Sequence, residues 1–97
     1  FLYRSHTGSL LMLWSSFGDD GRYKVGVARS QSGKLTGPWE QEKSPIYEND
    51  GGHAMLFRDF SGRLLMTLHT PNHQPSRPVI LVMEDKGDTI TIQAQSE

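Results

Sequence analysis

The sequence has 97 residues, a formal net charge of −1 and no cysteine. This length is enough for one small domain. Acidic and basic residues are interspersed, so no concentrated positive surface is expected to bind nucleic acid or an anionic membrane. The lack of cysteine excludes disulfides and thiol chemistry, and no apolar run approaches the roughly 20 residues of a membrane helix. We therefore expect neither a nucleic acid nor a membrane as a partner.

Strand patterns dominate the first half of the chain. Residues 1–4 already have the pattern of a strand. Because a native N-terminus rarely begins inside a strand, we expect the sequence to be a fragment. Residues 10–15 are apolar on both faces, as expected of a strand buried between two layers. Residues 23–28 alternate between apolar and polar side chains, and residues 39–43 are a candidate fourth strand.

The second half shows the same kind of pattern. Residues 79–83 are apolar throughout and residues 89–92 alternate, so both segments predict strands. Glycine and proline interrupt every window that would otherwise favour a helix. The sequence therefore predicts an all-β fold.

An internal repeat relates the two halves at a constant offset of 54 residues. Six of the twelve pairs formed by residues 1–12 and 55–66 are identical. The same offset, continued without a gap, places Val25 on Val79 and Val27 on Leu81. The identical pairs are Leu2/Leu56, Arg4/Arg58, Gly8/Gly62, Leu10/Leu64, Leu11/Leu65 and Met12/Met66.

Four-stranded antiparallel units that repeat at about 50 residues are typical of β-propeller blades. We therefore predict two such blades, residues 1–48 and 49–97, from a larger propeller whose remaining blades are their partners. Two blades alone would leave apolar faces and unpaired edges in water. The alternative is an unrelated all-β interaction module in which a pair of hairpins is duplicated.

Propeller geometry predicts which residues share one end of the blades. The first strand of a blade lines the central channel, and the later strands meander outward. His53 at the start of an innermost strand, Arg77 at the start of a third strand and the loops 17–22 and 70–78 should lie at one mouth of the channel. Asp19 and Asp20 in the first of these loops are candidates for its rim.

Several segments together resemble glycoside hydrolase family 43. Residues 1–4 (FLYR), 11–15 (LMLWS), 23–30 (YKVGVARS) and 35–39 (LTGPW) resemble its fourth blade, and residues 52–57 (GHAMLF) and 65–69 (LMTLH) resemble the start of its fifth. The resemblance implies the C-terminal part of a five-bladed propeller that cleaves α-L-arabinofuranosidic or β-D-xylosidic bonds with inversion. It further implies an arabinose- or xylose-containing plant polysaccharide as the substrate, and a secreted or periplasmic location.

The resemblance also implies that this sequence carries no catalytic residue. The family uses two aspartates from earlier blades and a glutamate general acid, which is expected just upstream of Phe1. Inverting hydrolysis needs two carboxyls about 6.5–9.5 Å apart, one of them with a raised pKa, whereas the acids here are mostly in turns. The fragment alone is therefore expected to be inactive. A carbohydrate-binding propeller without catalysis is the alternative.

Two residues are candidates for the site. From the residues alone, His53 is interpreted as a structural histidine at a strand start. The resemblance implies instead that it lies beneath the sugar pocket and is the one protein ligand of Ca²⁺ or a similar ion, although calcium ordinarily prefers oxygen. Arg77 could be a solvated surface arginine, but the resemblance implies that it binds the substrate.

Other candidates receive structural interpretations. His69 and His73 have an i, i+4 spacing, but Pro71 between them argues against a helical zinc pair, and His69 is expected to pack or hydrogen-bond near the pocket wall. Trp14 is expected to be buried between blades and Trp39 to pack at a blade edge. The four methionines are expected to lie in the core: Met12, Met55, Met66 and Met83.

Overall fold

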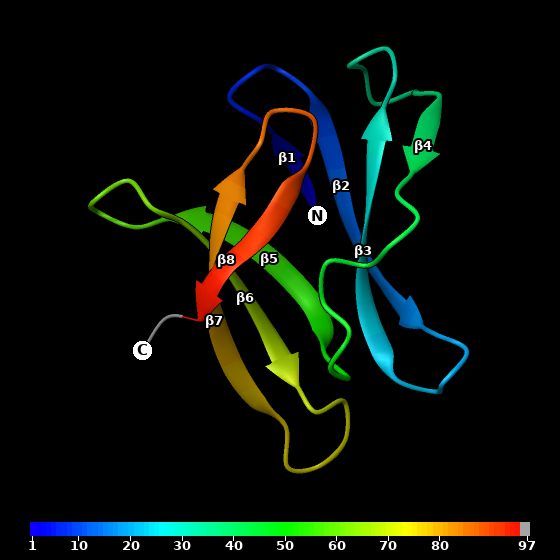
Figure 1. The fold of residues 1–97 in the computed structure, drawn as a ribbon, viewed down its shortest axis with the longest axis vertical. Helices are drawn as coiled ribbons and strands as arrows, with labels where there is room; N and C mark the ends of the chain where they lie inside the picture. Colours follow the sequence, from blue (N-terminus) through cyan, green and yellow to red (C-terminus); the bar gives the residue numbers. More distant parts are fainter. Residues whose placement is uncertain (96–97) are drawn as a thin grey trace.

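The computed structural model describes residues 1–95, which form two four-stranded antiparallel sheets and no helix (Figure 1). The described residues therefore contain no helix that could cross a membrane. Each sheet is a meander in chain order. The first sheet holds β1 (Leu2–Arg4), β2 (Leu10–Phe17), β3 (Tyr23–Ser30) and β4 (Trp39–Gln41), and the second holds β5 (Gly52–Arg58), β6 (Leu64–Thr70), β7 (Arg77–Asp85) and β8 (Ile90–Gln95).

The repeat appears in the structure as a shared turn. Gly8 follows β1 and Gly62 follows β5, and both have a positive φ, of 92° and 89°, a backbone conformation that glycine adopts without steric cost. In each turn the arginine at the end of the preceding strand donates from Nη1 to the carbonyl oxygen of that glycine, at 3.0 Å for Arg4 and 2.9 Å for Arg58. The identical residues of the two halves therefore build the same local structure.

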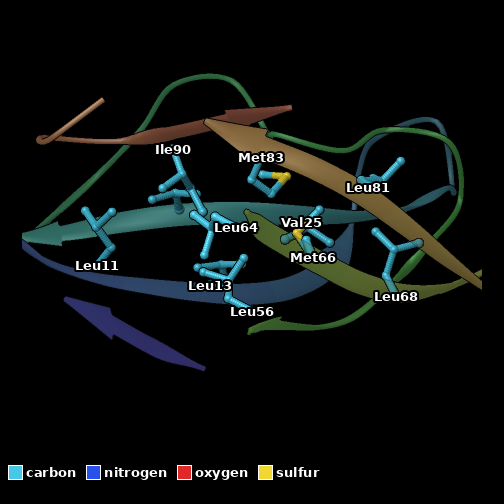
Figure 2. Packing of buried hydrophobic residues seen from close by; sticks show 11 residues of the cluster. Leu11, Leu13, Val25, Leu56, Leu64, Met66, Leu68, Leu81, Met83 and Ile90 are labelled. Carbon is cyan, nitrogen blue, oxygen red and sulfur yellow. The ribbon is translucent and has the colours of Figure 1, made fainter. Parts of the chain in front are cut away.

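One hydrophobic core lies between the two sheets (Figure 2). Both strands at the centre of each sheet contribute to it, so the sheets pack face to face. Each fully buried aliphatic side chain contributes about 1.5–3 kcal/mol. The core consists of Leu11, Leu13, Val25, Val27, Leu56, Leu64, Met66, Leu68, Leu81, Met83 and Ile90.

The gapless offset of 54 is wrong for the third strands. Leu13 pairs with Val27, whereas Thr67, the counterpart of Leu13, pairs with Ile80. The counterpart of Val27 is therefore Ile80 and not Leu81, so β7 is related to β3 by 53 residues. The second hairpin is shorter by one residue. A shift of one residue in the alignment moves every side chain of the strand to the opposite face of the sheet.

The predicted core position of Met55 is wrong: it is 49% exposed, on the face of its sheet that points away from the other sheet. Trp14 is 43% exposed on the outer face of the first sheet, so its burial against a further blade stays a prediction. Met66 and Met83 are buried in the core as predicted, and Met12 is partly buried. Trp39 packs at the edge of the first sheet, where its Nε1 donates to the Leu35 carbonyl oxygen at 3.1 Å.

The segment after β4 leads the chain from one sheet to the other. The predicted fourth strand ends early, at Gln41, and residues 42–51 then run along β3. Tyr47 forms an isolated bridge with Val25, and the Gly51 N–H donates to the Tyr23 carbonyl oxygen at 2.9 Å. We call residues 42–51 the linker. It delivers the start of β5 to the turn end of the β2–β3 hairpin.

Candidate functional site

Three segments meet at one end of the two sheets: the β2–β3 hairpin, the end of the linker and the β6–β7 loop (the lower end in Figure 1). The antiparallel pairing of β5, β6 and β7 places the starts of β5 and β7 at this same end. His53 and Arg77 therefore share it, as the meander predicts. Their predicted roles in binding a sugar or a metal stay predictions.

Two buried glycines bring the chain into this position. A Cβ atom on Gly52 would lie 2.2 Å from Cε2 of Tyr23 and 2.9 Å from Oγ of Ser15. A Cβ atom on Gly51 would lie 2.8 Å from the carbonyl oxygen of His69. All three distances are too short for the Cβ atom of another residue, so the two glycines are needed where the linker meets the start of β5. They place the next residue, His53, directly beside the first sheet.

His53 has an unusual backbone. Its φ is 57°, in the left-handed region, and the β5–β6 register shifts between Gly52 and Met55. Its N–H donates to Oγ of Ser15 in the first sheet at 3.1 Å, while its side chain is exposed. A residue other than glycine in this conformation costs about 1–3 kcal/mol, and bulges and strain of this kind cluster at functional sites.

Four rings form a row across the two sheets, which we call the ring row. The Phe17 and Tyr23 ring centroids are 5.0 Å apart, Tyr23 and His69 are 6.4 Å apart, and His69 and His53 are 6.2 Å apart. His69 also shares a hydrogen bond of 3.1 Å between its Nε2 and Oδ1 of Asn72, in line with its predicted packing role. The ring row gives this end a wall of flat side chains on which an apolar sugar face can stack.

Asp50 ties the three segments together. Its Oδ1 accepts the Tyr23 N–H at 2.9 Å and its Oδ2 accepts the Asn72 N–H at 3.2 Å. These N–H groups, Tyr23 first and Asn72 after it, lower the pKa of the Asp50 carboxyl against the opposing effect of burial. Its φ of 60° adds a second left-handed residue three positions before His53. Asp50 is therefore a positioning residue and more than the turn residue expected from the sequence.

No local pattern in the sequence could have identified this role of Asp50. Its partners are 27 and 22 residues away and belong to different sheets. The Asp-Gly-Gly composition is typical of many turns. Only the folded arrangement of the linker against β3 and the β6–β7 loop brings the three together.

The rim carries charged residues with local partners. Asp20 accepts the Arg22 N–H at 3.0 Å and pairs with Nζ of Lys24 at 3.3 Å, while Asp19 is exposed beside it. Arg77 is exposed at the first position of β7, opposite Thr70. Both predicted rim acids and the predicted substrate arginine thus lie at this end, in reach of solvent.

The histidines of the β6–β7 region do not act as a pair. His69 bonds to Asn72, whereas Nδ1 of His73 lies 3.2 Å from the Gln74 carbonyl oxygen. An open pocket of about 260 Å³ lies at this loop; its lining residues are His69, Asn72, His73, Gln74 and Ser76.

Four aspartates do not suit acid catalysis. A general acid needs a raised pKa, but the pKa values of Asp20, Asp50, Asp59 and Asp85 are lowered. Hydrogen bonds from neighbouring N–H, hydroxyl or guanidinium groups outweigh burial in these carboxyls. These four side chains therefore act as ionised hydrogen-bond acceptors that position the chain.

Residues 1–95 do not make a calcium site on their own. Calcium takes 6–8 oxygen ligands, and residues 1–95 contain no cluster of three or more His, Asp or Glu side chains that could hold a metal. Among residues 1–95, His53 offers one exposed imidazole, so a metal ion held there would take most of its ligands from water. We assign no chemical step to a metal.

Comparison with known proteins gives one solved structure and no match to a family model or a curated protein. The structure is an endo-arabinase from Bacteroides thetaiotaomicron VPI-5482, with a TM-score of 0.85 and 47% sequence identity. The match covers 92% of this chain and 32% of that enzyme. The predicted all-β fold, two four-stranded antiparallel sheets arranged as in part of a propeller enzyme, is confirmed.

Proposed function

We propose that this chain forms two blades of a glycoside hydrolase of family 43 that cleaves arabinan. The observation that carries the proposal is 47% identity to an endo-arabinase over 92% of the chain. The chain spans 32% of that enzyme, so the catalytic carboxylates and the remaining blades of a five-bladed propeller would come from elsewhere in the protein. The comparison favours an α-L-arabinofuranosidic substrate over a β-D-xylosidic one.

In this proposal the chain supplies part of the pocket wall. The ring row would stack against sugar faces, His53 would contact the substrate or hold a water-rich metal ion, and Arg77 would donate hydrogen bonds to sugar hydroxyls. Asp50 would hold the linker against the β6–β7 loop. Hydrolysis with inversion would follow from two carboxyls of other blades. Secretion or a periplasmic location fits an enzyme whose substrate is a plant polysaccharide.

A chimera tests this proposal. This chain replaces the matching segment of the Bacteroides endo-arabinase, and hydrolysis of linear arabinan and of xylan is measured. We expect arabinan cleavage with inversion and little activity on xylan. A chimera that folds, as judged by a cooperative melt, but cleaves neither polymer would contradict the proposal and would favour a carbohydrate-binding propeller.

Two histidine variants of the chimera separate a role in the site from a role in stability. His53→Ala should lower kcat/KM on arabinan by about 100-fold or more, about 3 kcal/mol of lost transition-state stabilisation, with a small change in Tm. His6→Ala, at the opposite end of the sheets, should lower Tm and leave kcat/KM nearly unchanged. Arg77→Ala should mainly raise KM. Equal losses of activity and Tm in His53→Ala would make His53 structural.

A further inference from the structure

The ring row ends at an aromatic ring that is open to solvent. Phe17, its outermost member, is 62% exposed, whereas the two middle members, Tyr23 and His69, are half-buried. A single exposed apolar side chain needs no explanation. Phe17, however, continues a row of packed rings: it lies opposite Tyr23 in the hairpin, and their ring centroids are 5.0 Å apart. Its exposed surface is therefore part of the candidate site.

Phe17 does not lie on the outer face of the first sheet, where a preceding blade would pack. Side chains alternate between the two faces of a strand, and Phe17 shares its face of β2 with Leu11 and Leu13 of the core. The second sheet does not reach as far as Phe17. β5 begins beside Ser15, whose Oγ accepts the His53 N–H at 3.1 Å, and Phe17 lies two residues further along β2. The Phe17 ring thus projects past the start of the second sheet.

The middle of the ring row is held firmly in place. The Tyr23 ring packs directly on Gly52, where a Cβ atom would lie 2.2 Å from Cε2 of the ring. The Tyr23 N–H donates to Oδ1 of Asp50, and the Tyr23 carbonyl oxygen accepts the Gly51 N–H, both at 2.9 Å. A surface that is ordered before its ligand arrives loses little entropy on binding. The ring row is therefore a preformed platform.

Polar groups accompany the Phe17 ring. Asp19 is exposed two residues later in the hairpin, and Phe17, Asp19 and Lys24 border the hairpin end of an open cavity of about 400 Å³. Ligand sites combine flat apolar side chains with a few polar groups that fix the orientation of the ligand. A sugar matches both, because its ring carbons form an apolar face and its hydroxyls form hydrogen bonds. The Phe17 end of the row therefore suits a carbohydrate.

The length of the ring row suits a chain of sugars better than a single sugar. From His53 to Phe17, the centroids of neighbouring rings are 6.2, 6.4 and 5.0 Å apart. In a propeller, His53 would begin the innermost strand of its blade, whereas Phe17 would end the second strand of the neighbouring blade. On the basis of the proposed function, we propose that an arabinan chain runs outward along the ring row and that Phe17 binds a sugar remote from the cleaved bond. This contact makes the site favour long substrates over short ones.

Substrates of different length test this role of Phe17, because binding energy from a remote sugar helps only substrates that reach it. In the chimera with the Bacteroides endo-arabinase, Phe17→Ala should lower kcat/KM on linear arabinan about tenfold more than on arabinotriose, a difference of about 1.4 kcal/mol. Phe17→Tyr keeps a ring and should retain the preference for the long substrate. Phe60→Ala removes a fully exposed phenyl ring from the β5–β6 turn at the opposite end of the sheets. This matched control should behave as the parent chimera on both substrates.

A binding measurement keeps the test independent of the proposed function. If the chimera cleaves no arabinan, the proposed function fails, but retardation in native gels that contain linear arabinan still measures binding. Phe17→Ala should weaken this retardation, and Phe60→Ala should not. Equal losses on arabinan and arabinotriose in an active chimera, or equal retardation of the two variants in an inactive one, would overturn the role of Phe17. So would a large fall in Tm for Phe17→Ala without a change in substrate preference, because Phe17 would then pack against another blade.

Discussion

Gly52 and His53 have opposite steric needs, although they are neighbours. Only glycine fits at position 52, because the Tyr23 ring occupies the place of a Cβ atom. His53 has a φ of 57°. A glycine would adopt this φ without strain, yet the residue here carries an imidazole. Strain that a simple substitution would relieve points to a use for the side chain. At the scale of single residues, this is the strongest sign that His53 has a function.

Replacing His53 in the 97-residue chain measures this strain. His53→Gly should be more stable than His53→Ala by about 1 kcal/mol, because glycine adopts a positive φ freely and alanine does not. Urea unfolding at one fixed protein concentration gives the difference. If the alanine variant equals or exceeds the glycine variant in stability, the left-handed conformation is not imposed by the fold.

At the scale of elements, strands and turns could be predicted because each depends on nearby residues. The alternation in residues 23–28 is such a local signal, and the strand it predicts is β3. The register of β7 could not be predicted, because residues 79–83 are apolar at every position and fit the core in either register. Asp50 and the left-handed His53 were missed because their partners, Tyr23, Asn72 and Ser15, are distant in sequence.

Asp50→Asn tests how the linker, β3 and the β6–β7 loop are joined. Asparagine tolerates the positive φ but keeps only one acceptor oxygen, so one of the two N–H groups loses its partner. We expect the Tm to fall by about 4 °C or more at pH 7. Asp19→Asn, at an exposed position of the same end, is the matched control and should change Tm little.

Acid should reduce this difference between Asp50→Asn and the unmodified chain. The folded state lowers the pKa of Asp50, so its carboxylate stabilises the fold above the unfolded value near 4 and loses this effect as pH falls below it. A difference in Tm that is the same at pH 7 and in strong acid would mean that the charge on Asp50 does not matter.

At the scale of the whole molecule, polar contacts hold the two sheets together at both ends of the core. Asp50 and Ser15 do so at the candidate site. At the opposite end, Asp85 accepts hydrogen bonds from the Tyr3 hydroxyl at 2.7 Å and from the His6 N–H at 2.9 Å. The Ser5 and Thr7 hydroxyls donate to the Gly87 carbonyl oxygen beside it. The core sets the distance between the sheets, and these contacts fix their relative position.

Asp85 makes this far end sensitive to acid. Burial acts to raise the pKa of Asp85, but hydrogen bonds from Tyr3, Gly87 and His6 outweigh it and hold the pKa at about 2. Because the folded pKa is lowered from 3.8, the carboxylate stabilises the fold fully above about pH 4 and loses this contribution as pH falls through 2. Near the surface, solvent screening limits this contribution to about 1–2 kcal/mol.

Comparing Asp85→Asn with the unmodified chain isolates this contribution. Urea unfolding at pH 7 should show a loss of about 1–2 kcal/mol in the variant, and the difference should shrink towards zero near pH 2. Asp88→Asn, in the same turn but exposed, should match the unmodified chain at both pH values. The shared decline of all three proteins in acid then reports on other carboxylates. A difference for Asp85→Asn that persists undiminished at pH 2 would show that the shape of the side chain, and not its charge, holds the sheets together.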